Sequence, residues 1–460
     1  MYDSALKLII FLIIPVIFIL LFSLSYYLPS VGGIKFKDTD FKAQLVVKGL
    51  TRPTGMIFLD DNDMLITEKQ GTVQRIIGSE ILQTPVLDIR QIINDTGERG
   101  LLSVGISRFN NDGENKKNDN GALIYILFTN EKGKNATNNV NCLAEPCKNL
   151  QNVFNSLYQY EFKQGGMINP KLLANVPLYS NESIQHIGGV LTVGPDEKLY
   201  FTGGDGRGCE YFEDCVSKTS YFTGDNESKS TGAIYFLEDN PGVVSNETSL
   251  DEYYQFAYGI RNSFGLDFDP VTGNLWDTEN GPAFGDEINL VKPGFNSGWP
   301  KFQGIWSVTN YSQLFNNPPP GLPNGYYFSE IPQNPVDFNG SGEYSTPEFS
   351  WNQTVGVTTV KFFDSNKFGS KFKNDIFIAT FKGGVIYHFD LNEGRDQLVL
   401  KGPLTDKVAN SDKEMDNYIF AQDFGPNGIS DLEVGPDGYL YVLTYGLNGA
   451  IYRIVPNNNT

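Results

Sequence analysis

The stretch GPDGYLYVLTYGLNGAIYRI, residues 435–454, shows the pattern that decides the fold. A polar turn with Asp and Gly leads into a short run of aromatic and β-branched residues. A second glycine-containing turn then leads into another such run. Turn residues that flank short β-prone runs are typical of antiparallel strands joined by tight connections. The stretch therefore predicts two neighbouring strands of one sheet.

Six copies of this pattern lie along the chain, about 60 to 100 residues apart. The other five begin at Asp60, Asn118, Gly194, Asp269 and Lys373. One small sheet cannot bury both of its faces, whereas six sheets packed around a common axis cover one another. The sequence therefore predicts an all-β, six-bladed β-propeller over residues 42–456.

The composition agrees with a turn-rich protein that has an acidic surface. Glycine (48 residues) and proline (24 residues) are plentiful, and aromatic residues make up 13% of the chain, as expected of many short strands and turns. Acidic residues outnumber basic residues by 54 to 35, and the sequence pI is about 4.6. Such a surface repels a phosphate backbone, so nucleic acid is not an expected partner.

The N-terminus carries a predicted membrane anchor. Residues 8–28 form a run of 21 residues without a charge, which is long enough to cross a bilayer as a helix. No small-x-small cleavage site follows the run, which favours an uncleaved anchor over a cleaved signal peptide. We expect residues 1–30 to form an N-terminal transmembrane helix or uncleaved signal and residues 31–41 to form a linker. The propeller is then expected to be extracytoplasmic, held at the cell membrane.

Cysteines and sequons also favour an exported domain. The pairs Cys142/Cys147 and Cys209/Cys215 suit two short-loop disulfides in an oxidising compartment. Zinc binding is the alternative, although neither pair has C-x2-C spacing and no histidine lies close by. Nine N-x-S/T sequons together favour a glycoprotein. They start at Asn94, Asn135, Asn181, Asn226, Asn246, Asn310, Asn339, Asn352 and Asn458.

His186, one of only two histidines, is the first candidate catalytic residue. Gly188 and Gly189 follow it and allow a close approach of backbone or ligand. Asp205 comes after the next predicted strand and can return beside His186. A carboxylate on one imidazole nitrogen fixes the tautomer and leaves the other nitrogen as a base. A buried structural histidine is the alternative, and it is our interpretation of His388, which lies in an alternating strand.

Residues 258–300 form a second candidate region, rich in Asp, Glu, Asn and Gly. Arg261 and Asn262 precede one predicted strand, and Asp286 and Glu287 come soon after the turn that follows the next. Carboxylates and carbonyls gathered in turns suit a hard cation such as Ca²⁺. A solvated acidic loop is the alternative for such a run.

This region also carries a resemblance to a known family, the soluble PQQ-dependent glucose/sorbosone dehydrogenases, also called aldose sugar dehydrogenases. The resemblance covers nearly all of the chain after the anchor. RPTGMIFLDDNDMLITEKQGTV resembles the family's first blade, and GERGLLSVGI resembles its G-x-G-G-L-L segment. The most specific matches are Arg261-Asn262, Gly265-Leu266, Asp269-Pro270, Gly273, Leu275-Trp276, Glu279-Asn280-Gly281-Pro282, Asp286-Glu287-Ile288-Asn289, Pro293-Gly294 and Gly298-Trp299-Pro300.

The resemblance implies a six-bladed propeller that oxidises an aldose at C1 to the lactone, with hydride transfer to PQQ. Electrons would then pass to a membrane acceptor. His186 would be the general base, and Asp205 would orient it. Arg261 would act in catalysis and would contact the cofactor together with Asn262, while Lys382 would pair with a PQQ carboxylate.

The same resemblance implies calcium. The carbonyls of Gly281 and Pro282 would hold a Ca²⁺ that also binds PQQ and polarises its reactive carbonyl. Asp286 and Glu287 would help to bind further structural calcium.

Three arginines of the family's pattern are absent, and Ile187 replaces the asparagine of its histidine motif. The motif H-N-G-G-R ends in Val190 in this chain, and the motif R-I-R-D has Gly428 and Ser430 in place of its arginines. PQQ is a tricarboxylate, and each lost hydrogen bond to a charged group weakens binding by about 1.5–3 kcal/mol. Two alternatives therefore stand beside the dehydrogenase. One is a PQQ-less propeller that binds a glycan or protein at the cell surface, and the other is a Ca²⁺-dependent hydrolase such as a lactonase.

Overall fold

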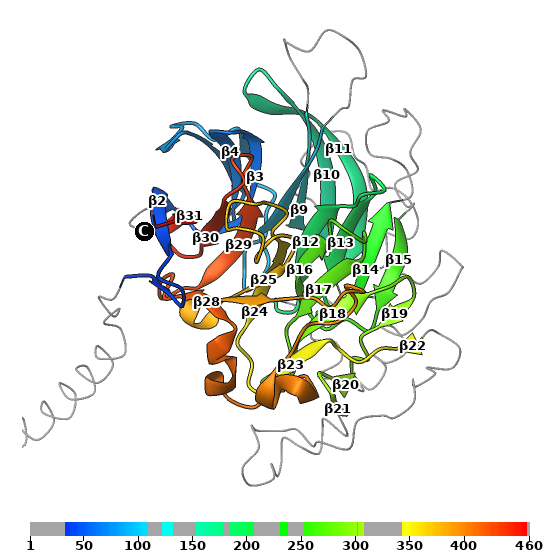
Figure 1. The fold of residues 1–460 in the computed structure, drawn as a ribbon. Helices are drawn as coiled ribbons and strands as arrows, with labels where there is room; N and C mark the ends of the chain where they lie inside the picture. The colour runs from blue at the N-terminus through cyan, green and yellow to red at the C-terminus, as the bar shows by residue number, and fades with distance from the viewer. Residues whose placement is uncertain are drawn as a thin grey trace, which may run out of the picture.

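Antiparallel sheets surround a central axis in the computed structural model (Figure 1). The structure describes residues 33–108, 122–131, 153–178, 184–206, 231–237, 253–300, 302–307 and 343–457. Within these ranges the sheets form six blades, so the prediction of an all-β, six-bladed propeller is confirmed. The helices described in these ranges are short 3₁₀ turns, at Lys382–Gly384, Gly402–Asp406 and Asp412–Asn417.

The first three blades follow one another along the chain. Blade 1 contains β3 (Pro53–Asp60), β4 (Asp63–Glu68), β5 (Thr72–Ile77), β6 (Glu80–Ile81) and β7 (Leu87–Asp88). Blade 2 contains β8 (Leu101–Arg108), β9 (Ala122–Glu131), β10 (Val153–Lys163) and β11 (Gly166–Pro177). Blade 3 contains β12 (Gly188–Val193), β13 (Leu199–Gly203), β14 (Ala233–Leu237) and β15 (Tyr253–Tyr258), extended by β19 (Phe295–Asn296) and β22 (Glu343–Tyr344).

The last three blades complete the ring. Blade 4 contains β16 (Ser263–Phe268), β17 (Leu275–Glu279), β18 (Asp286–Val291), β23 (Phe349–Trp351) and β27 (Val408–Ala409). Blade 5 contains β24 (Val357–Phe362), β25 (Ile376–Thr380), β26 (Ile386–Phe389), β28 (Ile419–Gln422) and β1 (Lys35–Phe36). Blade 6 contains β29 (Ile429–Val434), β30 (Leu440–Thr444), β31 (Gly449–Pro456) and β2 (Phe41–Leu50). Outside the blades, β20 (Phe302–Gln303) and β21 (Trp306–Ser307) form a two-stranded ribbon.

The copies that begin at Asp60, Lys373 and Gly435 contain the second and third strands of a blade, as predicted, and the other three copies contain the second strand alone. The second strands are thus common to all six copies. These strands are β4, β9, β13, β17, β25 and β30. Every residue of β13, β17, β25 and β30 is buried. The second strand of a blade pairs with another strand along each edge, and neighbouring blades cover both of its faces. Its sequence is therefore a nearly continuous apolar run.

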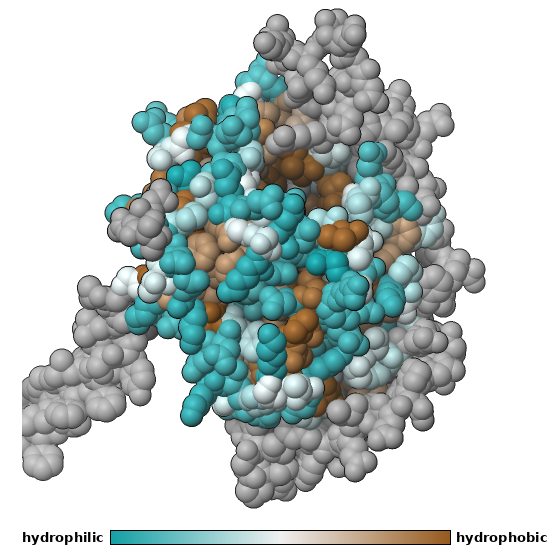
Figure 2. Space-filling view, viewed as in Figure 1, coloured by the Kyte–Doolittle hydropathy of each residue, from teal (hydrophilic) through white to brown (hydrophobic). Residues whose placement is uncertain are grey.

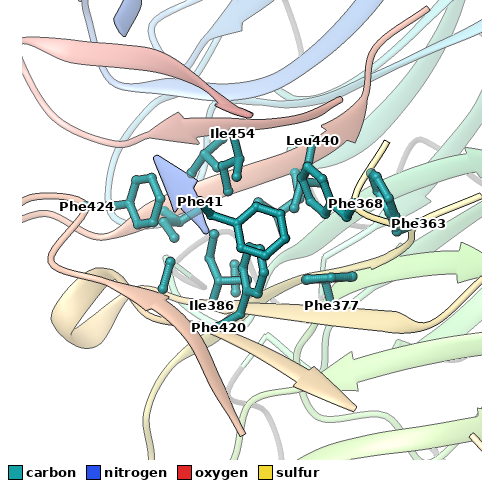
Figure 3. Close-up of a cluster of buried hydrophobic side chains, with 14 of the residues drawn as sticks. Phe41, Phe363, Phe368, Phe377, Ile386, Phe420, Phe424, Leu440 and Ile454 are labelled. Atoms are coloured by element: carbon teal, nitrogen blue, oxygen red, sulfur yellow. The ribbon is translucent and has the colours of Figure 1, made fainter. Parts of the chain in front are cut away.

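The ring is closed by the N-terminal strand. β2 pairs antiparallel with β31, with Phe41 opposite Pro456 and Gln44 opposite Arg453. Residues from the start of the propeller therefore form the outermost strand of its last blade. Figure 3 shows how Phe41 from β2 packs among Phe377, Phe420 and Ile454 in the core between blades 5 and 6. This closure covers the outer edge of β31 and joins the start and the end of the propeller through one apolar cluster.

The same topology gathers loops at one rim of the central channel. In each blade the innermost strand pairs antiparallel with the second strand, so the start of the first and the end of the second lie together. His186 lies just before β12, and Asp205 lies just after β13. Arg261 lies just before β16 and Asn280 just after β17. The fold therefore brings these predicted site residues to one rim.

Some predictions lie outside the described residues. They are the anchor over residues 1–30, both cysteine pairs, and the sequons other than Asn94 and Asn352. Both of those asparagines are half-buried. Within the described ranges, the structure contains no helix with the length and apolar character needed to span a bilayer. The face in Figure 2 is largely hydrophilic, with small apolar areas near its centre.

Candidate active site

His186 and Asp205 form a buried pair at the channel rim. His186 Nδ1 lies 2.8 Å from Asp205 Oδ1, and the two residues are 6% and 0% exposed. The other carboxylate oxygen of Asp205 accepts a hydrogen bond from Trp299 Nε1 at 2.8 Å. The Gly206 amide donates to the His186 carbonyl at 2.9 Å, which ties the two rim loops together. Contacts to both of its oxygens therefore fix the position of the Asp205 carboxylate.

The backbone at His186 takes a conformation that side chains rarely adopt. His186 has φ +52°, and Gly188 and Gly189 have φ +65° and +107°. A Cβ on Gly188 would come within 2.7 Å of the Gly204 amide nitrogen. The glycine pair thus allows the rim loop to fold against the end of β13 and directs the imidazole inward. Backbone strain of this kind is typical of functional sites.

The carboxyl of Asp205 stays ionised despite its burial. Burial alone raises its pKa, but hydrogen bonds from His186 and Trp299 and the charge of Arg261 outweigh that effect. The net result is a pKa below the usual value for aspartate. A permanent negative charge therefore lies against Nδ1 of the imidazole.

Arg261 lies on the other side of the imidazole. Its Nη2 is 2.7 Å from His186 Nε2, and its Nη1 donates to the Asn280 carbonyl at 2.8 Å. The guanidinium also lies over the Trp299 ring, at 5.2 Å. Because a guanidinium only donates, Nε2 must accept, and the imidazole proton must lie on Nδ1 facing Asp205. The geometry therefore selects the tautomer with its proton on Nδ1, and the Nε2 lone pair faces the Arg261 guanidinium.

Glu98 is a site residue that the sequence interpretation missed. Its Oε2 accepts from the His186 amide at 2.8 Å and from Asn262 Nδ2 at 3.2 Å. The Asn262 side-chain oxygen in turn accepts from the Gly188 amide at 3.0 Å. Glu98 lies within the GERGLL segment, where a charged residue between two glycines was the only available signal. It connects the loop before β8 to the loops that carry His186 and Arg261.

A cavity of about 540 Å³ extends from this constellation down the central channel. His186, Arg261 and Asn262 line it at the rim, and Lys361 and Glu433 line it at depth. Lys361 Nζ lies 2.8 Å from Glu433 and 3.7 Å from Asp267. Burial alone lowers the pKa of Lys361, but these carboxylates outweigh it and raise that pKa. The volume suits a cofactor-sized ligand.

A second set of carboxyls is buried beside the rim in blade 4. Asp277, Glu279 and Glu287 are at most 1% exposed. Ser297 Oγ donates to Glu279 at 2.6 Å and to Glu287 at 3.2 Å, and Glu279 also accepts from the Arg261 amide at 2.6 Å. Burial raises the pKa of Asp277 to about 7 and that of Glu287 to about 8. Burial and repulsion by Glu287 raise the pKa of Glu279 as well.

The predicted calcium ligands divide into two kinds. Gly281 and Pro282 line the cavity, next to Asn280. Glu287 belongs to the buried carboxyl set, where a cation would offset repulsion. Asp286, in contrast, accepts hydrogen bonds from the amides of Gly281, Val355 and Gly356 and from Thr354 Oγ1, at 2.7–2.9 Å. Asp286 therefore joins two rim loops through hydrogen bonds to both of its oxygens.

Lys382, which the resemblance assigns to the cofactor, lies next to the cavity-lining residue Phe381. Its Nζ donates to the Thr354 carbonyl at 2.7 Å, the side chain is exposed, and it is not among the cavity-lining residues. The described residues thus bring together His186, Asp205, Arg261 and Asn262 and leave Lys382 outside. His388 lies on blade 5, with Nε2 2.9 Å from Asp375 and 3.7 Å from Asp390, away from the cavity.

The cavity fits a planar anionic quinone and a cation. Lys69 and Arg261 supply positive charge, and Asn262 supplies an amide. Glu433 and Asp431 also line the cavity, burial raises both pKa values, repulsion by Glu433 adds to the rise at Asp431, and Lys361 pairs with Glu433. Val190 and Ser430, which stand where the family has arginines, line the cavity too. The donor set is therefore suited to such a cofactor but poorer in arginine.

The chain is similar in sequence to known sugar dehydrogenases. The family model described as Glucose / Sorbosone dehydrogenase matches residues 50–453. Aldose sugar dehydrogenase YliI of Escherichia coli K12 is 30% identical over 221 residues, which are 48% of this chain and 48% of that protein. Quinoprotein glucose dehydrogenase B of Acinetobacter calcoaceticus is 28% identical over 300 residues, which are 61% of this chain and 58% of that protein. These two matches thus span about half of each relative.

A solved structure shows the same fold. The PQQ-bound form of the aldose sugar dehydrogenase from Streptomyces coelicolor superimposes with a TM-score of 0.54 at 17% identity. The superposition covers 91% of this chain and 99% of that one. At this identity the likeness concerns the arrangement of the blades.

Proposed function

This chain belongs to the glucose/sorbosone dehydrogenase family, and on that premise we propose that it oxidises an aldose sugar at C1 to the lactone, with PQQ as the hydride acceptor. The observation that carries the proposal is the buried Asp205–His186–Arg261 constellation at the rim of the cavity. Relatives named as aldose sugar dehydrogenase and quinoprotein glucose dehydrogenase support the same reaction class.

The residues of this chain supply base catalysis and positioning. His186 Nε2, in the tautomer selected by Asp205, accepts the proton of the C1 hydroxyl when that hydroxyl takes the place of Arg261 Nη2, which donates to Nε2 in this structure. Asp205 stabilises the imidazolium that forms, since its charge lies against Nδ1. Arg261 and Asn262 line the cavity where they hold the cofactor's polar groups. PQQ, when bound, supplies a carbonyl that accepts the hydride. Gly281 and Pro282 offer backbone carbonyls to Ca²⁺.

The cellular setting forms part of the proposal. The uncharged run over residues 8–28 supports a single membrane anchor, and the sequons and cysteine pairs support an extracytoplasmic propeller. An anchored propeller of this kind passes its electrons to an acceptor in the membrane. Protease treatment of intact cells checks this topology, because only an external propeller is cleaved without lysis.

Cofactor reconstitution tests the reaction. The full chain, purified in detergent, is loaded with PQQ and Ca²⁺, freed of excess cofactor and mixed with a panel of aldoses. We expect about one quinone per chain to be retained, and its absorbance spectrum to change to that of the reduced form when a sugar substrate is added. A folded protein that retains no quinone would contradict the proposal and favour a propeller that binds glycan or protein.

Asp205 provides a further test of the mechanism. We expect the Asp205→Asn variant to lose about 10²-fold or more in kcat, because an amide can present its NH₂ to Nδ1 and so stabilise the wrong tautomer. The loss is measured by steady-state sugar oxidation and the tautomer by ¹⁵N-histidine NMR. The control is Trp299→Phe, which removes one hydrogen bond to Asp205 and should cost less than the Asn variant. An unchanged kcat and tautomer in Asp205→Asn would refute the role.

A further inference from the structure

Two aromatic side chains lie together at the rim of the cavity. Phe381 follows β25 and Tyr445 follows β30, and both line the cavity. Their ring centroids are 5.8 Å apart at an interplanar angle of 56°. Phe381 is 43% exposed although it is fully apolar. Exposed apolar side chains that cluster at a cavity mark ligand-binding surfaces. Phe381 and Tyr445 are named here the aromatic wall.

The topology places the aromatic wall across the channel from the proposed base. His186 belongs to blade 3 and Tyr445 to blade 6, and blades 3 and 6 lie opposite each other in a closed ring of six. Phe381 belongs to the adjacent blade 5. A ligand that enters between these rim loops therefore has His186 on one side and the aromatic wall on the other.

Gly428 holds the two residues of the aromatic wall in place at the rim. Gly428 has φ +72°, and a Cβ added to it would meet the Phe381 carbonyl at 2.0 Å and the Phe381 Cα at 2.4 Å. The Gly428 carbonyl also accepts the Tyr445 amide at 3.0 Å, and the Phe381 amide donates to the Gly356 carbonyl at 2.7 Å. The absence of a side chain at 428 is thus required for the close approach that sets Phe381 beside Tyr445.

We propose that the aromatic wall is the sugar-binding surface of this protein and that Phe381 and Tyr445 pack against the apolar C–H face of a pyranose ring. The inference rests on the proposed function and deepens it by assigning substrate recognition. A pyranose has hydroxyls around its edge and C–H groups on its faces, so aromatic rings bind a face while polar groups bind the edge.

Removing either ring of the aromatic wall is expected to weaken sugar binding. We expect Phe381→Ala and Tyr445→Ala each to raise KM for the aldose roughly 3- to 10-fold, with kcat changed less than about threefold. Phe381→Trp and Tyr445→Phe keep a ring and should stay near the wild-type KM. Leu447→Ala is the matched control, because Leu447 is 77% exposed on the same rim loop as Tyr445 but does not line the cavity. Circular dichroism verifies that each variant is folded.

Sugar binding without turnover separates this inference from the reaction itself. Saturation-transfer NMR on the full chain in detergent, with aldoses at millimolar concentration and no added PQQ, should show contact with wild type and Leu447→Ala and a clearly weaker signal with Phe381→Ala. That pattern supports the wall even if no sugar is oxidised. Three outcomes overturn it: no sugar contact with wild type, equal contact with Phe381→Ala, or loss of quinone retention at unchanged KM. The last outcome would mean that the rings hold the cofactor.

Discussion

The His186→Gln variant is expected to lose sugar oxidation by roughly 10²- to 10⁴-fold in kcat, the range that a general base contributes. Glutamine keeps a polar side chain of similar reach but cannot accept a proton at neutral pH. Its amide can still meet Asp205, so the rim should remain folded. The measurement is single-turnover reduction of the loaded quinone by the sugar, which isolates the chemical step from release of products.

The second histidine provides a matched control. His388 lies outside the cavity, with its Nε2 2.9 Å from Asp375. We expect His388→Gln to keep near wild-type kcat, with a change confined to stability. If His186→Gln retained wild-type turnover, the base would have to be another residue, and the mechanism proposed here would be wrong.

Stability in the absence of divalent cations is expected to fall as the pH rises from about 5 to 8. Burial raises the pKa of Asp277 to about 7 and of Glu287 to about 8, so the folded chain binds these protons more tightly than the unfolded chain does. Below the usual carboxyl pKa these two groups make their full contribution to the free energy of unfolding. That contribution is lost as the pH rises past their pKa values in the folded protein. A carboxyl pKa that is higher by one in the folded chain corresponds to about 1.4 kcal/mol of this contribution.

Denaturant unfolding in chelator at several pH values measures this dependence. Glu287→Gln should flatten the fall, because the variant has no proton to lose at that position. Added Ca²⁺ should restore stability near pH 8 in the wild type if the buried carboxyls hold a cation. Asp412→Asn, at an exposed acidic position, should leave the dependence unchanged. A stability that rises from pH 5 to 8 in chelator would contradict the assignment of these groups as neutral acids in the folded protein.

The fold was predictable because its strongest signal is local. A turn with Asp and Gly followed by an apolar strand marks the second strand of every blade, and these strands are buried whatever the neighbouring loops contain. The closing strand β2 carried no comparable signal. Only three of its ten residues, Phe41, Val47 and Leu50, are buried, and only the contact with β31, about 400 positions away, explains its place.

The candidate site was predictable in part. Asp205 lies beside His186, as its position after the next strand suggested. The roles of Glu98 and Trp299 were missed, since both reach His186 or Asp205 from other loops. Lys382 was assigned to the cofactor by resemblance, but its Nζ bonds the Thr354 carbonyl outside the cavity. Asp286 accepts hydrogen bonds from the amides of Gly281, Val355 and Gly356, a joining role that the sequence did not indicate.

The sequence by itself determined the number of blades, the acidic character of the protein and the residues able to act as base and orienting carboxylate. These properties depend on residue type and on spacing along the chain, so they can be read locally. Only the tertiary structure decided which side chains face the channel and which proton the imidazole carries. Those properties depend on contacts between rim loops from different blades, such as Arg261 on His186 and Gly428 against Phe381, and such contacts exist only once the ring has closed.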